Sequence, residues 1–202
     1  MLKFHVRGHG KPQKLGVLAG GFNPPTVAHE GLVNAARYHV DEVLCVVPTA
    51  LPHKEYFGAS LEQRLEMLVE SQIPSLGSIA SSEAGLFVEI ARECREHYGS
   101  DVQLYFICGR DAAERVLNWD YGRAGVVDEM LGDFELLVAA RQGEFDPPPE
   151  FSGRIHRMYL PGDHDLVSST EVRERIARGE PWEHLVPGEI AERVRRIYSK
   201  NG

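Results

Sequence analysis

A glycine-rich stretch near the N-terminus carries residues that are suited to binding a charged ligand. Residues 16–36 read GVLAGGFNPPTVAHEGLVNAA: a short apolar run, then Gly20-Gly21, then turn formers, then apolar residues at helical spacing. Glycine lets backbone N–H groups approach an anion, and a helix N-terminus adds the positive end of its dipole. Thr26 and His29 stand one helical turn apart and would face the same ligand. The stretch therefore predicts a phosphate site, and a glycine turn that serves packing alone is the alternative.

A second candidate anion site lies near the C-terminus, where residues 167–173 read VSSTEVR. Ser168 and Glu171 have the spacing of a helix capping box, and the apolar residues that follow predict a helix. Hydroxyl groups and unpaired N–H groups at a helix start suit phosphate oxygens, and the Arg173 guanidinium would add more donors. An ordinary capped helix explains the same pattern equally well.

Three other residues could contact a ligand. Lys54 follows His53 in a loop after a predicted strand and could meet phosphate, although a solvated surface lysine is the alternative. Asp111 comes just after the end of another strand, where a carboxylate can bind ribose hydroxyls or simply cap a helix. Trp119 could stack on an aromatic ring, but a single tryptophan more often packs against a helix.

Alternating strands and helices must position these residues. The predicted strands are apolar runs, and the segments between them show apolar residues at helical spacing. This alternation predicts an α/β fold with a doubly wound, mainly parallel sheet, which would bind ligands at the carboxyl ends of its strands. The predicted strands cover residues 17–19, 42–47, 102–108, 134–140 and 155–160, and helices start near residues 29, 61, 87 and 168. A further short helix is predicted after the glycine turn at residues 109–111.

The N-terminus and the charge exclude several classes of protein. Residues 1–14 are predicted to be a lead-in, either flexible or an edge strand over residues 2–6, and residues 15–202 to be a single domain. The lead-in lacks the apolar segment of a secretory signal, and no apolar run approaches the roughly 20 residues of a membrane helix. A net charge of −8 without a basic stripe argues against nucleic acid as the main partner.

The cysteines and histidines do not suggest a metal site. Cys45, Cys94 and Cys108 lack metal-ligand spacing, and two of them lie in apolar strand-like runs. We therefore expect buried thiols and a protein of the reducing cytoplasm. His156, together with His164 and the aspartate after it, forms a loose cluster that we interpret as loop polarity, with a metal site as the weaker alternative.

Together, the two candidate anion sites resemble the two signatures of the nucleotidyltransferase superfamily. GGFNPPTVAH is similar to its GxFxPxH/TxGH pattern, with Ala28 in place of the usual glycine, and VSSTEVR is similar to ISSTxxR. The resemblance narrows to the bacterial nicotinate mononucleotide adenylyltransferases through four further strings. These strings are PTALPHK, QRLEM, LYFICGRDAAERVLNW and HLVPGEIAERVRRIY. The likeness covers most of the chain from residue 15 onward and implies a Rossmann-like nucleotidyltransferase fold.

The resemblance implies transfer of AMP from ATP to the phosphate of a mononucleotide, with release of pyrophosphate. Nicotinate mononucleotide would be the acceptor, in NAD biosynthesis, and Mg²⁺ would be bound through the ATP phosphates without a protein metal site. The implied catalytic residues are His29, Thr26 and Arg173. The implied ATP-binding residues are Gly20, Gly21, Phe22, Lys54, Ser168, Ser169 and Thr170, and Gly109, Asp111 and Trp119 would bind the acceptor.

Two departures from the family pattern keep other functions open. The family usually carries an S-Y-T-V-D-T-like segment before its central strand, where residues 81–93 read SSEAGLFVEIARE, and Arg110 stands where a small residue is usual. One alternative is an adenylyl- or cytidylyltransferase of the same fold with another phosphate acceptor. The other is a catalytically inactive module that senses a nucleotide. The pattern is also compatible with a homo-oligomer.

Overall fold

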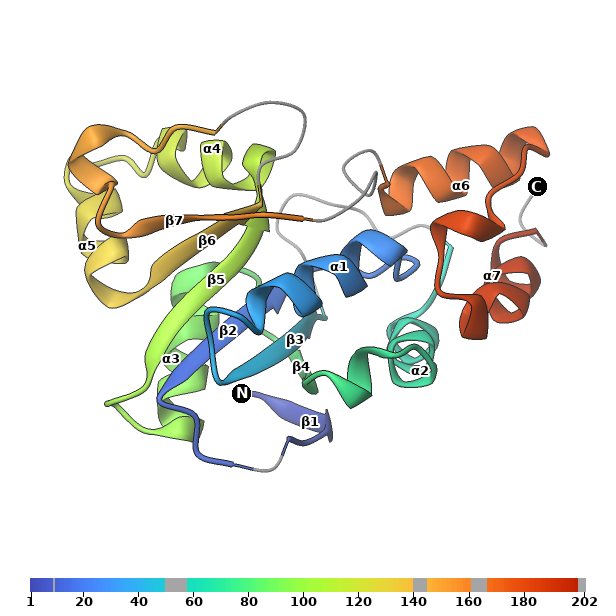
Figure 1. The fold of residues 1–202 in the computed structure, drawn as a ribbon, viewed down its shortest axis with the longest axis horizontal. Helices are drawn as coiled ribbons and strands as arrows, with labels where there is room; N and C mark the ends of the chain where they lie inside the picture. Colours follow the sequence, from blue (N-terminus) through green and yellow to red (C-terminus); the bar gives the residue numbers. More distant parts are fainter. Residues whose placement is uncertain (9, 50–57, 140–144, 161–166, 200–202) are drawn as a thin grey trace.

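A seven-stranded sheet is the centre of the computed structural model, which describes residues 1–8, 10–49, 58–139, 145–160 and 167–199 (Figure 1). The strand order is β1-β4-β3-β2-β5-β6-β7, and β1 alone pairs antiparallel, at the β4 edge. The strands are β1 Lys3–Val6, β2 Lys14–Ala19, β3 Glu42–Pro48, β4 Ser78–Ser82, β5 Gln103–Gly109, β6 Glu135–Ala139 and β7 Ile155–Met158. The predicted doubly wound, mainly parallel fold is confirmed.

The direction in which the strands are added changes between β2 and β5. The chain adds β3 and β4 on one side of β2, and then returns to add β5, β6 and β7 on the other side. In open α/β sheets the crevice at such a switch point, outside the carboxyl ends of the strands, is where ligands bind. The glycine-rich stretch follows β2, so the fold places it at the carboxyl end of β2, beside this switch point.

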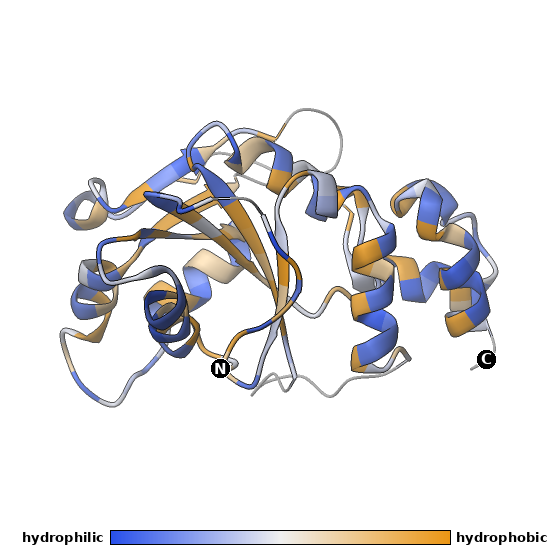
Figure 2. Cartoon of the chain, turned by 90° about the horizontal axis from the view of Figure 1, so that it is seen from below, coloured by the Kyte–Doolittle hydropathy of each residue, from blue (hydrophilic) through white to orange (hydrophobic). Residues whose placement is uncertain are grey.

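Helices cover both faces of the sheet, as the apolar strands require. Buried residues of α1 and α2 form one hydrophobic cluster with one face, and residues of α3, α4 and α5 form another with the opposite face. Figure 2 shows that these helices carry both hydrophobic and hydrophilic residues. The helices are α1 Val27–Ala36, α2 Leu61–Glu70, α3 Phe87–Tyr98, α4 Arg110–Asn118, α5 Val126–Asp133, α6 Ser169–Arg178 and α7 Ala191–Tyr198.

A third hydrophobic cluster joins the C-terminal helices to the rest of the molecule. It includes Val172 of α6 and Val194 of α7, together with Ala28 of α1 and Met67 of α2. Figure 1 shows α6 and α7 beside each other, far from α4 and α5. The cluster therefore holds the C-terminal helices against the first two helices.

Three elements were missed by the sequence prediction: β4, α5 and α7. β4 reads SIASS and is buried throughout, but its serines hide it from a search for apolar runs. The hydroxyl groups of Ser78, Ser81 and Ser82 find partners in Glu42, His5 and Glu93. Of the two interpretations of the N-terminus, the structure has the edge strand.

The three cysteines are free and buried, as predicted. Burial raises the pKa of Cys45, Cys94 and Cys108 to about 12, so each stays a neutral thiol. Over the described ranges, no helix combines the length and the apolar character that crossing a membrane requires.

Candidate active site

The loop between β2 and α1 is strained and tied to the sheet. The Gly20 N–H donates to the Val46 carbonyl at 3.1 Å, so the sheet already uses this donor. Phe22 is buried and has a φ of 46°, in the left-handed region that residues other than glycine seldom adopt. Its ring packs against the imidazole of His29, with ring centroids 4.8 Å apart. The unusual backbone of Phe22 thus supports the histidine that was predicted to face the ligand.

The contacts of His29 determine which of its ring nitrogens carries the proton. His29 Nδ1 lies 3.0 Å from the Thr26 backbone nitrogen and 2.7 Å from Thr26 Oγ1. Because a backbone N–H can only donate, Nδ1 is the acceptor, and the proton of the neutral ring is on Nε2. Thr26, which is fully buried, caps α1. The start of α1 therefore presents an imidazole whose Nε2–H is a hydrogen-bond donor.

The start of α6 lies directly against this loop. Ser169 Oγ donates to the Pro24 carbonyl at 2.7 Å, across 145 positions of sequence. Arg173 Nη1 donates to the Asn23 carbonyl at 2.5 Å, and Arg173 Nη2 donates to Thr170 Oγ1 at 3.3 Å. The fold therefore brings the two predicted anion sites into contact and places a guanidinium beside the glycine-rich loop.

Only half of the capping box expected for α6 forms. Ser168 Oγ accepts from the Glu171 N–H at 3.1 Å. The Glu171 carboxylate pairs instead with Arg175, one turn along the helix, at 2.6 Å. The Glu171 carboxylate therefore does not complete the capping box with the Ser168 backbone.

The residues predicted to bind the acceptor lie where β5 passes into α4. Gly109 ends β5 and precedes α4, Asp111 is exposed in the first turn, and Trp119 follows the last turn with 47% of its surface exposed. Arg110 forms an ion pair with Glu114 at 2.6 Å. Because β2 and β5 are parallel neighbours, this junction and the glycine-rich loop both lie at the carboxyl ends of the strands. Lys54 and His53 lie outside the described residues.

Two buried residues of this region were not predicted as part of the site. Arg64 of α2 is only 2% exposed, and its Nη1 donates to the Gly21 carbonyl at 3.0 Å. Tyr198 of α7 is 8% exposed, and its hydroxyl donates to Asn23 Oδ1 at 2.5 Å. The sequence did carry a signal for Arg64, because it falls at helical spacing on the apolar side of its helix, beside Leu65 and Leu68. No comparable signal marks Tyr198.

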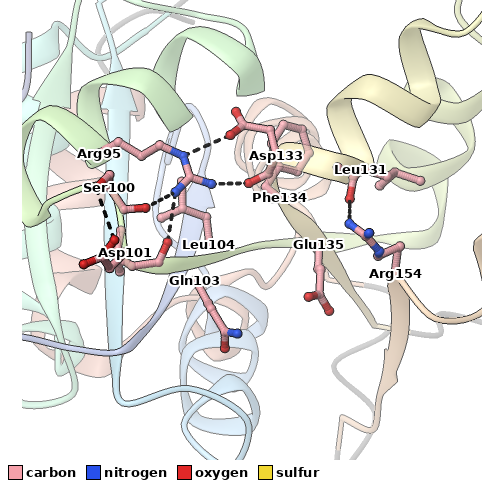
Figure 3. Close-up of a pocket in the computed structure, with 12 residues that line it drawn as sticks. Arg95, Ser100, Asp101, Gln103, Leu104, Leu131, Asp133, Phe134, Glu135 and Arg154 are labelled. Atoms are coloured by element: carbon pink, nitrogen blue, oxygen red, sulfur yellow. Dashed lines mark hydrogen bonds and ion pairs between the residues drawn. The ribbon is translucent and has the colours of Figure 1, made fainter.

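A cavity of about 270 Å³ lies elsewhere, near the amino ends of β5 and β6 (Figure 3). Arg95 fills part of it and donates to Asp133 Oδ1 at 2.9 Å and to the carbonyls of Ser100 and Val102. Arg154 donates to the Leu131 carbonyl across the same cavity. None of the predicted site residues lines it, and its arginines satisfy carbonyl groups at the ends of neighbouring elements.

Comparisons with known proteins show the family and the fold. The model of the family described as cytidylyltransferase-like matches residues 17–175. A Moorella thermoacetica protein named probable nicotinate-nucleotide adenylyltransferase is 29% identical, over 92% of this chain and 90% of the relative. A Thermoanaerobacter protein of the same name is 27% identical, over 93% and 95%. The solved structure of Plasmodium falciparum nicotinic acid mononucleotide adenylyltransferase complexed with NaAD has a TM-score of 0.64 at 17% identity, over 83% of this chain and 86% of that one.

Proposed function

Because the chain belongs to the cytidylyltransferase-like family, we propose that it transfers AMP from ATP to the phosphate of nicotinate mononucleotide. The observation that carries the proposal is the contact between the two signatures. Ser169 and Arg173 of α6 hold the loop that precedes His29. The names of relatives that match over nine-tenths of the chain support this acceptor.

The chemistry asks the protein for positioning and for neutralisation of charge. A phosphate oxygen of the mononucleotide attacks the α-phosphorus of ATP, and the bond to the bridging oxygen breaks. Pyrophosphate leaves with the electron pair. Two polyanions must be held in line, and negative charge builds on the leaving group. A rigid loop at a helix start with cations beside it suits this task.

We assign the first signature to the reacting phosphate. The Nε2–H of His29 would donate to an oxygen of the α-phosphate, with Thr26 holding the ring in this tautomer. The backbone of Gly21 and Phe22 would lie beside it, whereas the N–H of Gly20 is already bound to Val46.

We assign the second signature to the remaining ATP phosphates. Arg173 has further N–H donors besides those that bind Asn23 and Thr170, and its charge would offset that of the pyrophosphate. The start of α6, with Ser168, Ser169 and Thr170, would face the phosphate oxygens. Lys54 would add a further positive charge. Mg²⁺ would be held through the ATP phosphates, where it would offset part of their negative charge.

The acceptor would lie toward α4. The Asp111 carboxylate, exposed in the first turn, suits ribose hydroxyls, and the half-exposed ring of Trp119 suits stacking on a base. The segment after β4 lacks the tyrosine and threonines that the resemblance implied. Its polar groups bond locally, with the Ala84 N–H donating to Ser82 Oγ at 2.9 Å. A transferase with another phosphate acceptor is therefore the second candidate function.

The test is pyrophosphate release from ATP and Mg²⁺ with a panel of acceptors. The panel contains nicotinate mononucleotide, nicotinamide mononucleotide, phosphopantetheine and a sugar phosphate. We expect turnover with nicotinate mononucleotide, and loss of that turnover when the metal is removed with a chelator. Turnover with a different acceptor alone would support the second candidate, and ATP binding without any turnover would support a nucleotide sensor.

A further inference from the structure

The C-terminal helix reaches the glycine-rich loop through one hydrogen bond. The hydroxyl of Tyr198, in the last turn of α7, donates to Asn23 Oδ1 at 2.5 Å, across 175 positions of sequence. Both side chains are buried, with 8% of each residue exposed. The backbone carbonyl of Asn23 accepts from Arg173. One residue of the loop is thus fixed by α7 through its side chain and by α6 through its main chain.

The ring of Tyr198 also packs on a second segment beside the loop. Gly58, shortly before α2, has a φ of +92°, and a Cβ atom built on it would lie 2.7 Å from Cε1 of Tyr198. The close approach leaves no room for a side chain at position 58. The tyrosine therefore bridges the glycine-rich loop and the start of the segment that leads into α2.

The hydroxyl of Tyr198 lies near two cations that hold the same loop. Burial raises the pKa of Tyr198, and the charges of Arg173 and Arg64 act in the opposite direction. Arg64 donates to the Gly21 carbonyl, as Arg173 does to the Asn23 carbonyl. Side chains from α2, α6 and α7 therefore converge on the loop between β2 and α1.

We propose that Tyr198 is a positioning residue, whose hydroxyl orients the glycine-rich loop for ATP through Asn23. The proposal rests on the proposed function, and it gives the C-terminal helix a part in ATP binding. Tyr198 acts through the loop and not on the reacting groups. A loop displaced by a fraction of an ångström would lose phosphate contacts and in-line geometry, while the acceptor side near α4 would be unaffected.

The first test replaces Tyr198 by phenylalanine, which keeps the ring on Gly58 and removes the hydroxyl. We expect kcat/KM for ATP to fall about tenfold, while the KM for the acceptor stays within about twofold. The matched control is Tyr38→Phe, because Tyr38 is 91% exposed and should change neither constant. Assays run well below both melting temperatures separate positioning from stability. A Tyr198→Phe variant with wild-type constants for ATP would overturn the proposal.

A double-mutant cycle tests the route through Asn23. In an Asn23→Ala background the hydroxyl has lost its acceptor, so adding Tyr198→Phe should change kcat/KM for ATP by less than about twofold. Independent, multiplying effects of the two substitutions would contradict the proposal.

Failure of the proposed function is recognised separately. If the wild-type chain turns over no acceptor, the proposed reaction is wrong. The positioning role is then measured as the Kd for ATP·Mg²⁺ by calorimetry. We expect that Kd to rise about tenfold in Tyr198→Phe and to stay unchanged in Tyr38→Phe; an unchanged value in both would overturn the positioning role.

Discussion

At the scale of residues, the chemistry depends on how a helix start fixes one imidazole. The backbone N–H and the hydroxyl of Thr26 both lie within hydrogen-bond distance of Nδ1 of His29, which accepts. The proton of the neutral ring is therefore on Nε2, which is a donor. The Phe22 ring supports the imidazole from a left-handed backbone. Strain of this kind persists where surrounding contacts over-determine it, which fits a loop held from three helices.

The role of His29 leads to the first prediction. His29→Ala should lower kcat by about 10²–10³-fold, because a preorganised donor to the reacting phosphate is lost. The fold should persist, since the half-buried imidazole lies at the edge of the core, against the Phe22 ring. The matched control is His39→Ala, whose side chain is exposed just after α1. Unchanged kcat in a folded His29→Ala variant would refute the assignment.

The sequence predicted the residues of the two signatures, but not the contacts that join them. Thr26 and His29 could be paired from their spacing because they are neighbours on one helix turn. Arg64 and Tyr198 could not be assigned, because their partners Gly21 and Asn23 are far away in sequence and only the fold brings them together. The roles of all these residues in catalysis stay predictions.

At the scale of elements, apolar patterning predicted the buried strands that consist of apolar residues. It missed β4, a buried strand that consists largely of serines. β4 satisfies its hydroxyl groups with side chains from β1, β3 and α3, so its burial follows from partners that no local pattern reveals. The glycine just before β4 has an equally specific role. A Cβ atom on Gly77 would lie 2.2 Å from the Val43 carbonyl oxygen.

The close approach at Gly77 gives the second prediction. Gly77→Ala should lower the free energy of unfolding by about 1–3 kcal/mol, because the backbones of β3 and β4 must separate to accept the methyl group. The control is Gly132→Ala in α5, where a Cβ atom would meet no described atom within 4 Å, and it should be neutral or stabilising by up to about 1 kcal/mol. Urea unfolding measures both variants. Equal stability of Gly77→Ala and the wild type would contradict the tight approach.

The edge strand β1 gives a prediction about pH. Burial lowers the pKa of His5 and the pKa of His97 below the ordinary value near 6.5. The charge of Lys3 adds to this effect at His5, and the charge of Arg7 adds to it at His97. Below about pH 6.5 the unfolded chain therefore binds more protons at these histidines than the folded chain does. The contribution of the neutral histidines to the free energy of unfolding is present above about pH 6.5 and is lost as the pH falls. Protonation of His97 would remove the ring nitrogen that accepts from Arg7 and would place two positive charges side by side. A protonated His5 could still donate to the Ser81 hydroxyl, so its cost comes from burying the charge beside Lys3.

Thermal unfolding measures this dependence. The melting temperature should decrease as the pH is lowered from about 8 to about 5.5. This decrease should be smaller in a variant that carries His5→Asn and His97→Asn. Identical pH profiles for the variant and the wild type would show that these histidines do not contribute.

At the scale of the whole molecule, the site is assembled from both ends of the chain. The doubly wound sheet could be predicted from the alternation of elements, and it places the glycine-rich loop at the switch point between β2 and β5. The third hydrophobic cluster then holds α6 and α7 against α1 and α2. We propose residues 15–202 as one domain, whose sheet β1 extends at the β4 edge.

The central claim is that the chain transfers the α-phosphate of ATP, with its adenosine, to a mononucleotide. The most direct measurement uses ATP labelled at the α-phosphorus, together with nicotinate mononucleotide and Mg²⁺, and separates the products. We predict that the label appears in the dinucleotide, that the pyrophosphate is unlabelled, and that both products form in equal amounts. Label that stays in ATP, or that is released as free AMP in the presence of the acceptor, would contradict the claim.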